Sequence, residues 1–123
     1  MRALSVLLVL FCLAVSPLLA QDPVKVDPKH YKVVLENDRV RVLRISLGPK
    51  EKSVMHEHPA AVATFLTDVH GKFTFPDGKT QEAHAKAGEA QWYAAVKHLP
   101  ENVSDKAFEL VLVELKGKPA AKK

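Results

Sequence analysis

The sequence is nearly free of cysteine, since Cys12 is the only one among 123 residues. It falls in an apolar stretch at the amino terminus that we expect to be removed as a signal peptide. The remaining chain has no thiol, so it can form neither a disulfide nor a thiolate metal ligand. Its stability must therefore come from a packed core, and about 100 residues suffice for one small domain.

The sequence also lacks an apolar run long enough to span a bilayer, which takes about 20 residues. The longest run covers about 3–15, with Arg2 before it and Pro17 and Ala20 after it. A basic start, a short apolar core, a helix breaker and a small residue are the layout of a secretory signal peptide. We predict cleavage after about residue 20 and a secreted or periplasmic protein without stable membrane insertion. The alternative is an uncleaved anchor.

Charge of one sign does not accumulate along the chain. Without residues 1–20, which contain Arg2, 17 basic side chains stand against 14 acidic ones, so the net charge is +3. The charges are interspersed, apart from a basic tail at 117–123. No basic stripe is interleaved with aromatic residues, and we therefore expect no binding to nucleic acid.

A convincing helical pattern is missing as well. After an arm at 21–29, short β-branched runs alternate with turn signals such as Pro76-Asp77-Gly78. We predict about eight strands within a domain at 30–116, a loop at 96–107, and a central last strand at 108–116 because that segment is apolar on both faces. The fold class is all-β, as a small antiparallel barrel or a two-sheet jelly roll that protects its edges.

Two histidines one residue apart, His56 and His58, are the strongest chemical signal in the sequence. Side chains at positions i and i+2 of a strand point to the same face, so this pair can offer two imidazoles to one metal ion. A third ligand must come from elsewhere, and His98 in the predicted loop could reach across the barrel. The alternative is a pair of partly exposed histidines on an edge strand.

Two segments resemble the two motifs of the cupin family. The segment 48–71, which contains the histidine pair, is similar to the first motif, and 88–102, which contains His98, is similar to the second. The flanking strands also resemble those of small single-domain cupins of type 2. The resemblance covers 30–116 and implies a jelly-roll barrel that holds a divalent metal through His56, His58 and His98.

The sequence departs from these motifs in lacking their carboxylate. Residues 60–63 are Ala-Ala-Val-Ala where the first motif has a glutamate, and Ala94 and Val96 replace the proline and glycine of the second. Three neutral imidazoles suit zinc, iron, copper or nickel and leave positions open for water or substrate. Some cupin-like dioxygenases have three-histidine centres, so the resemblance leaves open a metal-dependent oxygenase, isomerase or hydrolase.

Residues near the predicted centre are weaker candidates for a role. Glu101 could act as a general acid or base at the barrel mouth, and Tyr93 could supply a phenol. Gln91 and Tyr93 share one face of their strand and Trp92 occupies the other, and the sequence does not decide which of these faces lines the cavity. Phe65 is a further candidate for the pocket wall. Three histidines are expected outside the centre, although a rearrangement could bring one or two of them to the metal: His30, His70 and His84.

Three kinds of function remain open on this sequence. The first is a metal-dependent enzyme acting on a small molecule, and the second is a non-catalytic module that binds a small ligand. The third is a structural cupin that has lost its metal. The apolar run at 60–66 favours a small, apolar cavity. A homodimer is also compatible with the sequence, because the sheets of two chains could pair.

Overall fold

The computed structural model describes residues 21–117, so the predicted signal peptide and residues 118–123 of the basic tail lie outside the described residues. Within this range no helix has the length and apolar character needed to cross a membrane. One short helix and nine strands follow one another: α1 (Pro23–Val26), β1 (Tyr31–Glu36), β2 (Val40–Leu47), β3 (His56–His58), β4 (Ala61–Phe65), β5 (Val69–Thr74), β6 (Thr80–Ala85), β7 (Ala90–Tyr93), β8 (Val96–Asn102) and β9 (Phe108–Leu115).

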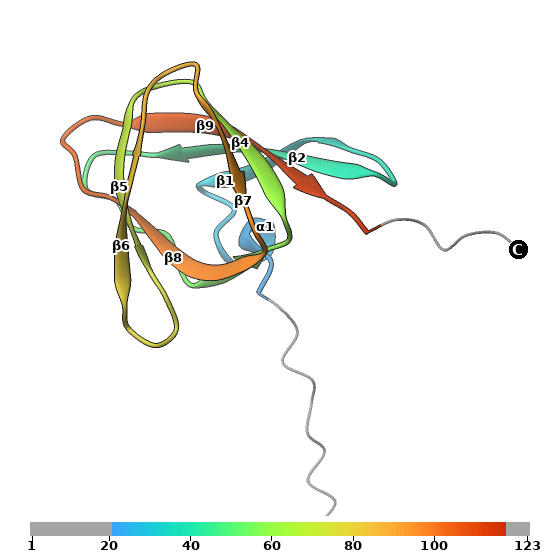
Figure 1. Ribbon diagram of the computed structural model, residues 1–123, viewed down its shortest axis with the longest axis horizontal. Coiled ribbons are helices and arrows are strands. Elements are labelled where there is room, and N and C mark those ends of the chain that lie inside the picture. The colour runs from blue at the N-terminus through green and yellow to red at the C-terminus, as the bar shows by residue number, and fades with distance from the viewer. Residues whose placement is uncertain (1–20, 118–123) are drawn as a thin grey trace, which may run out of the picture.

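The strands form two antiparallel sheets that curve around a common interior (Figure 1). The five-stranded sheet has the order β1-β2-β9-β4-β7, and the four-stranded sheet has the order β3-β8-β5-β6. β9 lies between β2 and β4, as its two apolar faces predicted. The predicted all-β jelly roll is therefore confirmed.

Alternation along the strands fills the interior. Every second residue of β9 turns its side chain inward, and Phe108 and Leu112 are buried members of this row. On the neighbouring strand β4, the inward side chains are those of Ala61, Ala63 and Phe65. These residues are nearly inaccessible to solvent. Because two of the inward residues of β4 are alanines, the core leaves space next to this strand.

Residues 21–29 fold against the barrel instead of forming an irregular arm. α1 begins after Asp22, whose Oδ1 accepts a hydrogen bond from the Val24 N–H at 3.0 Å. Pro23 suits the first helical position because its φ is already restricted. Both carboxylate oxygens of Asp22 also accept hydrogen bonds from Arg41, at 2.8 and 3.0 Å. A four-residue helix has no periodicity, so the sequence pattern did not reveal it.

The segment 96–102 is strand β8, and the predicted loop there is wrong. β8 pairs with β3 on one side and β5 on the other, so it lies inside its sheet. Pro100 suggested a loop because proline cannot donate to a strand ladder. The carbonyl oxygen of Pro100 still takes part in the pairing, because it accepts a hydrogen bond from the Ser53 N–H at 2.9 Å, just before β3. His98 therefore reaches the interior from a strand.

β1 forms one edge of the larger sheet, and several of its side chains are exposed, including Val34 and Leu35. An apolar edge of this kind is compatible with pairing between two chains. The homodimer stays a prediction.

Candidate metal centre

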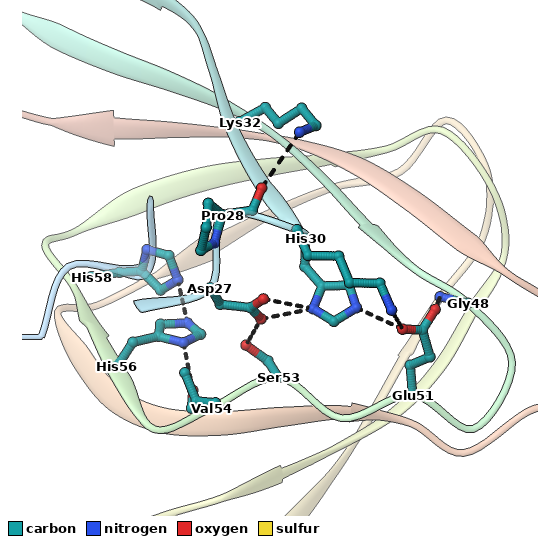
Figure 2. A network of polar contacts seen from close by, with 11 residues as sticks. Asp27, Pro28, His30, Lys32, Gly48, Glu51, Ser53, Val54, His56 and His58 are labelled. Carbon is teal, nitrogen blue, oxygen red and sulfur yellow. Dashed lines mark hydrogen bonds and ion pairs between the residues drawn. The ribbon is translucent and has the colours of Figure 1, made fainter. Parts of the chain in front are cut away.

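Two neighbouring strands bring the three predicted metal ligands together. His56 and His58 lie on β3, and His98 of β8 is the direct cross-strand partner of His56. All three side chains point into the barrel and are buried, with exposed fractions of 0%, 7% and 6%. One nitrogen from each ring lies within 4.8 Å of the others. The rings of His56 and His58 point toward each other (Figure 2).

Hydrogen bonds leave the two facing nitrogens of this pair without protons. His56 Nδ1–H donates to the carbonyl oxygen of Val54, and His58 Nδ1–H donates to Oε2 of Glu114, each at 2.7 Å. A neutral imidazole carries one N–H, so each Nε2 then presents a lone pair. The two Nε2 atoms are 2.9 Å apart. Two lone pairs at that distance repel each other unless a proton or a metal ion lies between them.

His98 favours a metal ion over a proton. Both of its ring nitrogens are buried and find no hydrogen-bond partner among the described residues. A buried polar group without a partner costs about 1–3 kcal/mol, and a proton shared by His56 and His58 would leave that cost in place. A metal ion bonded to all three rings would remove it for one of the two His98 nitrogens, and imidazole nitrogen is a good donor for zinc, copper, iron and nickel. The donor set therefore fits a transition metal.

Burial keeps these imidazoles in the form that binds metal. Burial and, after it, the neighbouring His58 lower the pKa of His56 to about 4. Burial and the charges of His58 and His56 lower the pKa of His98 to about 3. Both rings are therefore neutral at pH 7, and they need not release a proton before a metal binds.

Glu114 of β9 is a residue of the centre that the sequence analysis missed. Its side chain is 2% exposed, and its Oε1 accepts a hydrogen bond from Arg41 Nε at 2.6 Å while Oε2 holds His58. Burial alone would raise the pKa of Glu114, but the hydrogen bonds from His58 and Arg41 lower it on balance. The carboxylate is thus ionised, and it fixes the His58 ring so that Nε2 faces the centre.

The signal that could have revealed Glu114 is strand alternation. Glu114 shares its face of β9 with Phe108, Leu110 and Leu112, all of which line the interior. A carboxylate that continues an inward apolar row must have partners, because a buried unpaired charge is very costly. The carboxylate of the cupin motif is expected at 60–63, where this sequence has none. The buried carboxylate of Glu114 lies far away in sequence and is brought to the site by the pairing of β4 with β9.

The histidines border an apolar cavity inside the barrel. Its volume is about 70 Å³, several times the roughly 15 Å³ that a single water requires on the same measure. His58 and His98 line one part of it, and the ring of Phe73 lies with its centroid 4.6 Å from that of His98. Most of the remaining wall is aliphatic or aromatic, which suits a small apolar ligand.

The residues predicted around the pocket lie on β4 and β7, and only some of them line the cavity. Phe65 and Tyr93 line the cavity, and the Tyr93 hydroxyl donates to Oε1 of Gln91 at 2.8 Å. Burial raises the pKa of Tyr93, so it stays a protonated phenol. Gln91 does not reach the cavity wall, and Trp92 is 61% exposed on the opposite face. The predictions that Gln91 and Trp92 line the pocket are therefore corrected. Alternation along β7 turns Trp92 to the opposite face. Gln91 shares the face of Tyr93, but its amide is bonded to the Tyr93 hydroxyl and to the His84 carbonyl oxygen and does not line the cavity.

Glu101 borders the cavity, but its carboxylate is engaged elsewhere. It lies three residues after His98 on β8, so its side chain belongs to the opposite row. Its Oε2 is 3.4 Å from Lys72 Nζ and 4.0 Å from Lys52 Nζ. This position does not favour the predicted role of Glu101 as a general acid or base in the barrel.

His30, which was expected outside the centre, is buried in a separate polar network (Figure 2). Its Nδ1 contacts the Asp27 carboxylate at 2.7 and 2.9 Å, and its Nε2 contacts Glu51 Oε2 at 2.8 Å. Hydrogen bonds from Lys29 and His30 lower the pKa of Glu51 to about 2. The network joins residues 27–30 to the loop before β3, so His30 serves the packing of that segment and does not join the three-histidine cluster.

Comparison with known proteins supports the fold. No family model and no curated protein sequence matches the chain. A cupin domain from Bordetella pertussis superposes with a TM-score of 0.65 and 25% sequence identity, over 71% of this chain and 92% of that one. An RmlC-like cupin from Methanocaldococcus jannaschii, with a double-stranded β-helix fold, has a TM-score of 0.57 and 17% identity over 69% and 77%.

The chain has the cupin fold. A polyketide cyclase from Streptomyces resistomycificus shares it, with a TM-score of 0.52 and 18% identity over 72% of this chain and 66% of that one. The two strands that carry the histidines thus belong to a fold in which the sheets enclose a common interior. The cluster of His56, His58 and His98 lies in that interior.

Proposed function

We propose that this protein is an exported cupin that binds a divalent transition metal through His56, His58 and His98 and acts on a small molecule in the barrel. The observation that carries the proposal is the pair of buried His98 nitrogens without hydrogen-bond partners. Native proteins seldom leave such groups unpaired. The predicted signal sequence at 1–20 supports export.

The donor set narrows the choice of metal. Three neutral imidazoles suit zinc, iron, copper or nickel better than magnesium or calcium, which prefer oxygen ligands. A bound ion of this group would supply Lewis-acid polarisation or, for iron and copper, redox chemistry. Glu114 keeps Nδ1 of His58 protonated, and the Val54 carbonyl does the same for His56. The chain therefore aims both Nε2 atoms at one point before any metal arrives.

The cavity indicates the class of substrate. Its apolar walls exclude strongly charged molecules, and the Tyr93 hydroxyl is a polar group that could donate to a bound ligand after turning from Gln91. Phe73 and Tyr93 pack edge to face with ring centroids 6.2 Å apart, which positions the phenol beside the cavity. We infer a small, mainly apolar substrate. The polyketide cyclase with the same fold supports a small-molecule substrate.

A non-catalytic binding module is the second candidate, and the position of Glu101 favours it. The carboxylate proposed as acid or base is held by lysines, and the buried Glu114 is committed to His58 and Arg41. An enzyme without an independent acid or base must rely on the metal for its chemistry. A binding module needs only the pocket.

Metal analysis of the untagged full chain tests the proposal. We expect near-stoichiometric zinc, iron, copper or nickel by mass spectrometry after purification from an exporting bacterial host. Replacing His56 and His58 by alanine should remove the ion held in the barrel, which is one equivalent of metal. Glu57→Gln is the matched control, because Glu57 lies between the two histidines but on the other face of β3. The metal proposal is wrong if the wild-type protein stays metal-free after incubation with each ion.

The metal found then selects the assay. Iron calls for oxygen-uptake measurements with small apolar candidates, and zinc calls for hydrolysis assays. Amino-terminal sequencing of the exported protein tests cleavage at about residue 20. Binding of apolar ligands without turnover, under conditions where the metal is bound, would support the binding module over the enzyme.

A further inference from the structure

A second group of metal-binding side chains lies on the outer face of the β5–β6 hairpin. His70 of β5 is the direct cross-strand partner of His84 of β6, and Glu82 precedes His84 by two residues on the same strand. Strand alternation turns all three side chains to one face. They are exposed, with side-chain fractions of 47% for His70, 60% for His84 and 71% for Glu82. The group is therefore separate from the buried centre.

The donor atoms of this group converge. The two imidazole rings are stacked with centroids 4.4 Å apart and planes 23° from parallel. His84 Nε2 lies 3.0 Å from Glu82 Oε2, and His70 Nε2 lies 4.0 Å from Glu82 Oε1. One nitrogen of each ring and one carboxylate oxygen thus fall within 4.8 Å of one another. The carboxylate faces the two imidazoles with different oxygens.

The backbone around the group is well supported. β5 and β6 pair in unbroken register from Val69↔Ala85 to Thr74↔Thr80, and β5 is also paired with β8 on its other side. The spacing between the two strands is consequently set by main-chain hydrogen bonds and not by the histidines themselves. Metal binding would turn the stacked rings toward the ion and order three exposed side chains, at about 0.5–1.5 kcal/mol for each, while the backbone is already in place.

A surface hollow adjoins both histidines. Asp68, Lys86, Glu89 and Lys106 contribute to its walls. Two imidazoles and one carboxylate leave a tetrahedral ion one open position. The hollow leaves space beside the histidines for water or for a small anion.

We propose that His70, Glu82 and His84 form a second, surface metal site for zinc, copper or nickel, with one position open to water or an anion. Two imidazoles and a carboxylate are a common ligand set of zinc in proteins. The site is independent of the function proposed for the barrel, since the two share no ligand. Its exposure distinguishes it from the buried centre and should allow metal to enter and leave without any movement of the barrel.

Zinc titration of the full chain, stripped of metal, tests this site. The variant His70→Gln with His84→Gln should bind one zinc ion fewer than the wild type in calorimetry and equilibrium dialysis. Both positions are exposed, so folding is expected to survive, and circular dichroism checks this. A variant with His56→Gln and His58→Gln should retain the surface ion, which separates the failure of one site from the failure of the other.

A matched pair of carboxylate variants tests the third ligand. Glu82→Gln should weaken zinc binding at the surface site by at least about tenfold, as loss of even a supporting partner does at metal sites. Glu89→Gln also removes an exposed carboxylate, one that lines the hollow but is not among the grouped donors, and should leave the affinity unchanged.

Copper gives a direct spectroscopic readout. In the variant that lacks His56 and His58, we expect Cu²⁺ to show nitrogen hyperfine coupling from two imidazoles and to broaden the nuclear resonances of His70 and His84. The proposal is overturned if the variant lacking His70 and His84 binds as many zinc ions as the wild type with unchanged affinity. Equal effects of Glu82→Gln and Glu89→Gln would overturn the role of Glu82.

Discussion

The buried and the surface histidine groups have the same arrangement on their strands but differ in exposure to solvent. Each consists of a cross-strand histidine pair and a third side chain two residues away on one of the two strands: His58 beside His56↔His98, and Glu82 beside His70↔His84. The first group is almost sealed from solvent, and the second lies in water. The strand geometry is the same, so the chemistry of each group depends on its third donor and on its burial.

Burial changes what each side chain needs. In the barrel, a nitrogen without a partner costs free energy, and the His58 ring needs the ionised Glu114 and Arg41 behind it. On the surface, water satisfies any unused nitrogen, and Glu82 needs no further support. We expect the buried group to respond strongly to mutation and pH and the surface group to respond weakly.

Removing the buried carboxylate should have the largest effect. Glu114→Ala leaves Arg41 and His58 without their shared partner, and we expect the free energy of unfolding to fall by about 3–5 kcal/mol. Metal affinity at the barrel should fall as well, because His58 loses its orientation. Glu82→Ala is the matched surface change and should cost less than about 1 kcal/mol. Urea denaturation of both metal-free variants measures the difference, and equal losses would contradict the comparison.

Acid should destabilise the metal-free protein through the buried rings. His56 and His98 have folded-state pKa values of about 4 and about 3, below the ordinary 6.5 of an unfolded histidine. Between pH 6.5 and 4 the unfolded chain binds protons that the folded chain does not, so stability falls as the pH falls through this range. The expected loss is on the order of 3 kcal/mol per histidine.

Thermal and urea unfolding between pH 7.5 and pH 4 measure this dependence. In His98→Leu the contribution of His98 is gone, and the free energy of unfolding should depend less steeply on pH than in the wild type. Parallel pH profiles for the two proteins would show that the His98 ring does not stay neutral in the folded state.

The same His98→Leu change should stabilise the metal-free protein at pH 7. Leucine removes two buried nitrogens without partners, and we expect a gain of about 1–2 kcal/mol. Metal binding at the barrel should be lost together with this gain. A folded variant that is less stable than the metal-free wild type would mean that His98 has polar partners in solution.

The smallest expected effects concern the two faces of β7. Tyr93→Phe removes a hydrogen bond to Gln91 beside the cavity and should cost about 0.5–1.5 kcal/mol. Trp92→Ala changes an exposed side chain and should alter stability by less than about 0.5 kcal/mol. Binding of a fluorescent apolar ligand should change in the first variant and not in the second, whereas the opposite result would place Trp92 at the pocket.

Much of the fold could be predicted because strands carry a period of two that survives in the sequence. β9 was placed in the centre of a sheet from its two apolar faces, and the turn at 76–78 marks the β5–β6 hairpin. β8 could not be predicted, because Pro100 is a strong local argument against a strand and its compensating contact with Ser53 is remote in sequence.

The candidate metal centre also has features that the sequence predicts and features that it does not. His56 and His58 were grouped from their spacing alone, since alternation along one strand is a local property. The position of His98 opposite His56 depends on a strand pairing between residues about 40 positions apart, which no local pattern encodes. The burial of His30 could not be predicted for the same reason, because it depends on contacts with Glu51 and the loop before β3.

By itself, the sequence determined the all-β class, the shared face of His56 and His58, and the absence of a carboxylate from 60–63, because composition and alternation are local. The tertiary structure decided which rings lose water, which carboxylate supports His58, and which face of β7 meets the cavity. Those features depend on sheet closure, which brings Glu114 of β9 beside β3. Burial and pairing are properties of the closed barrel, and they give each histidine group its chemistry.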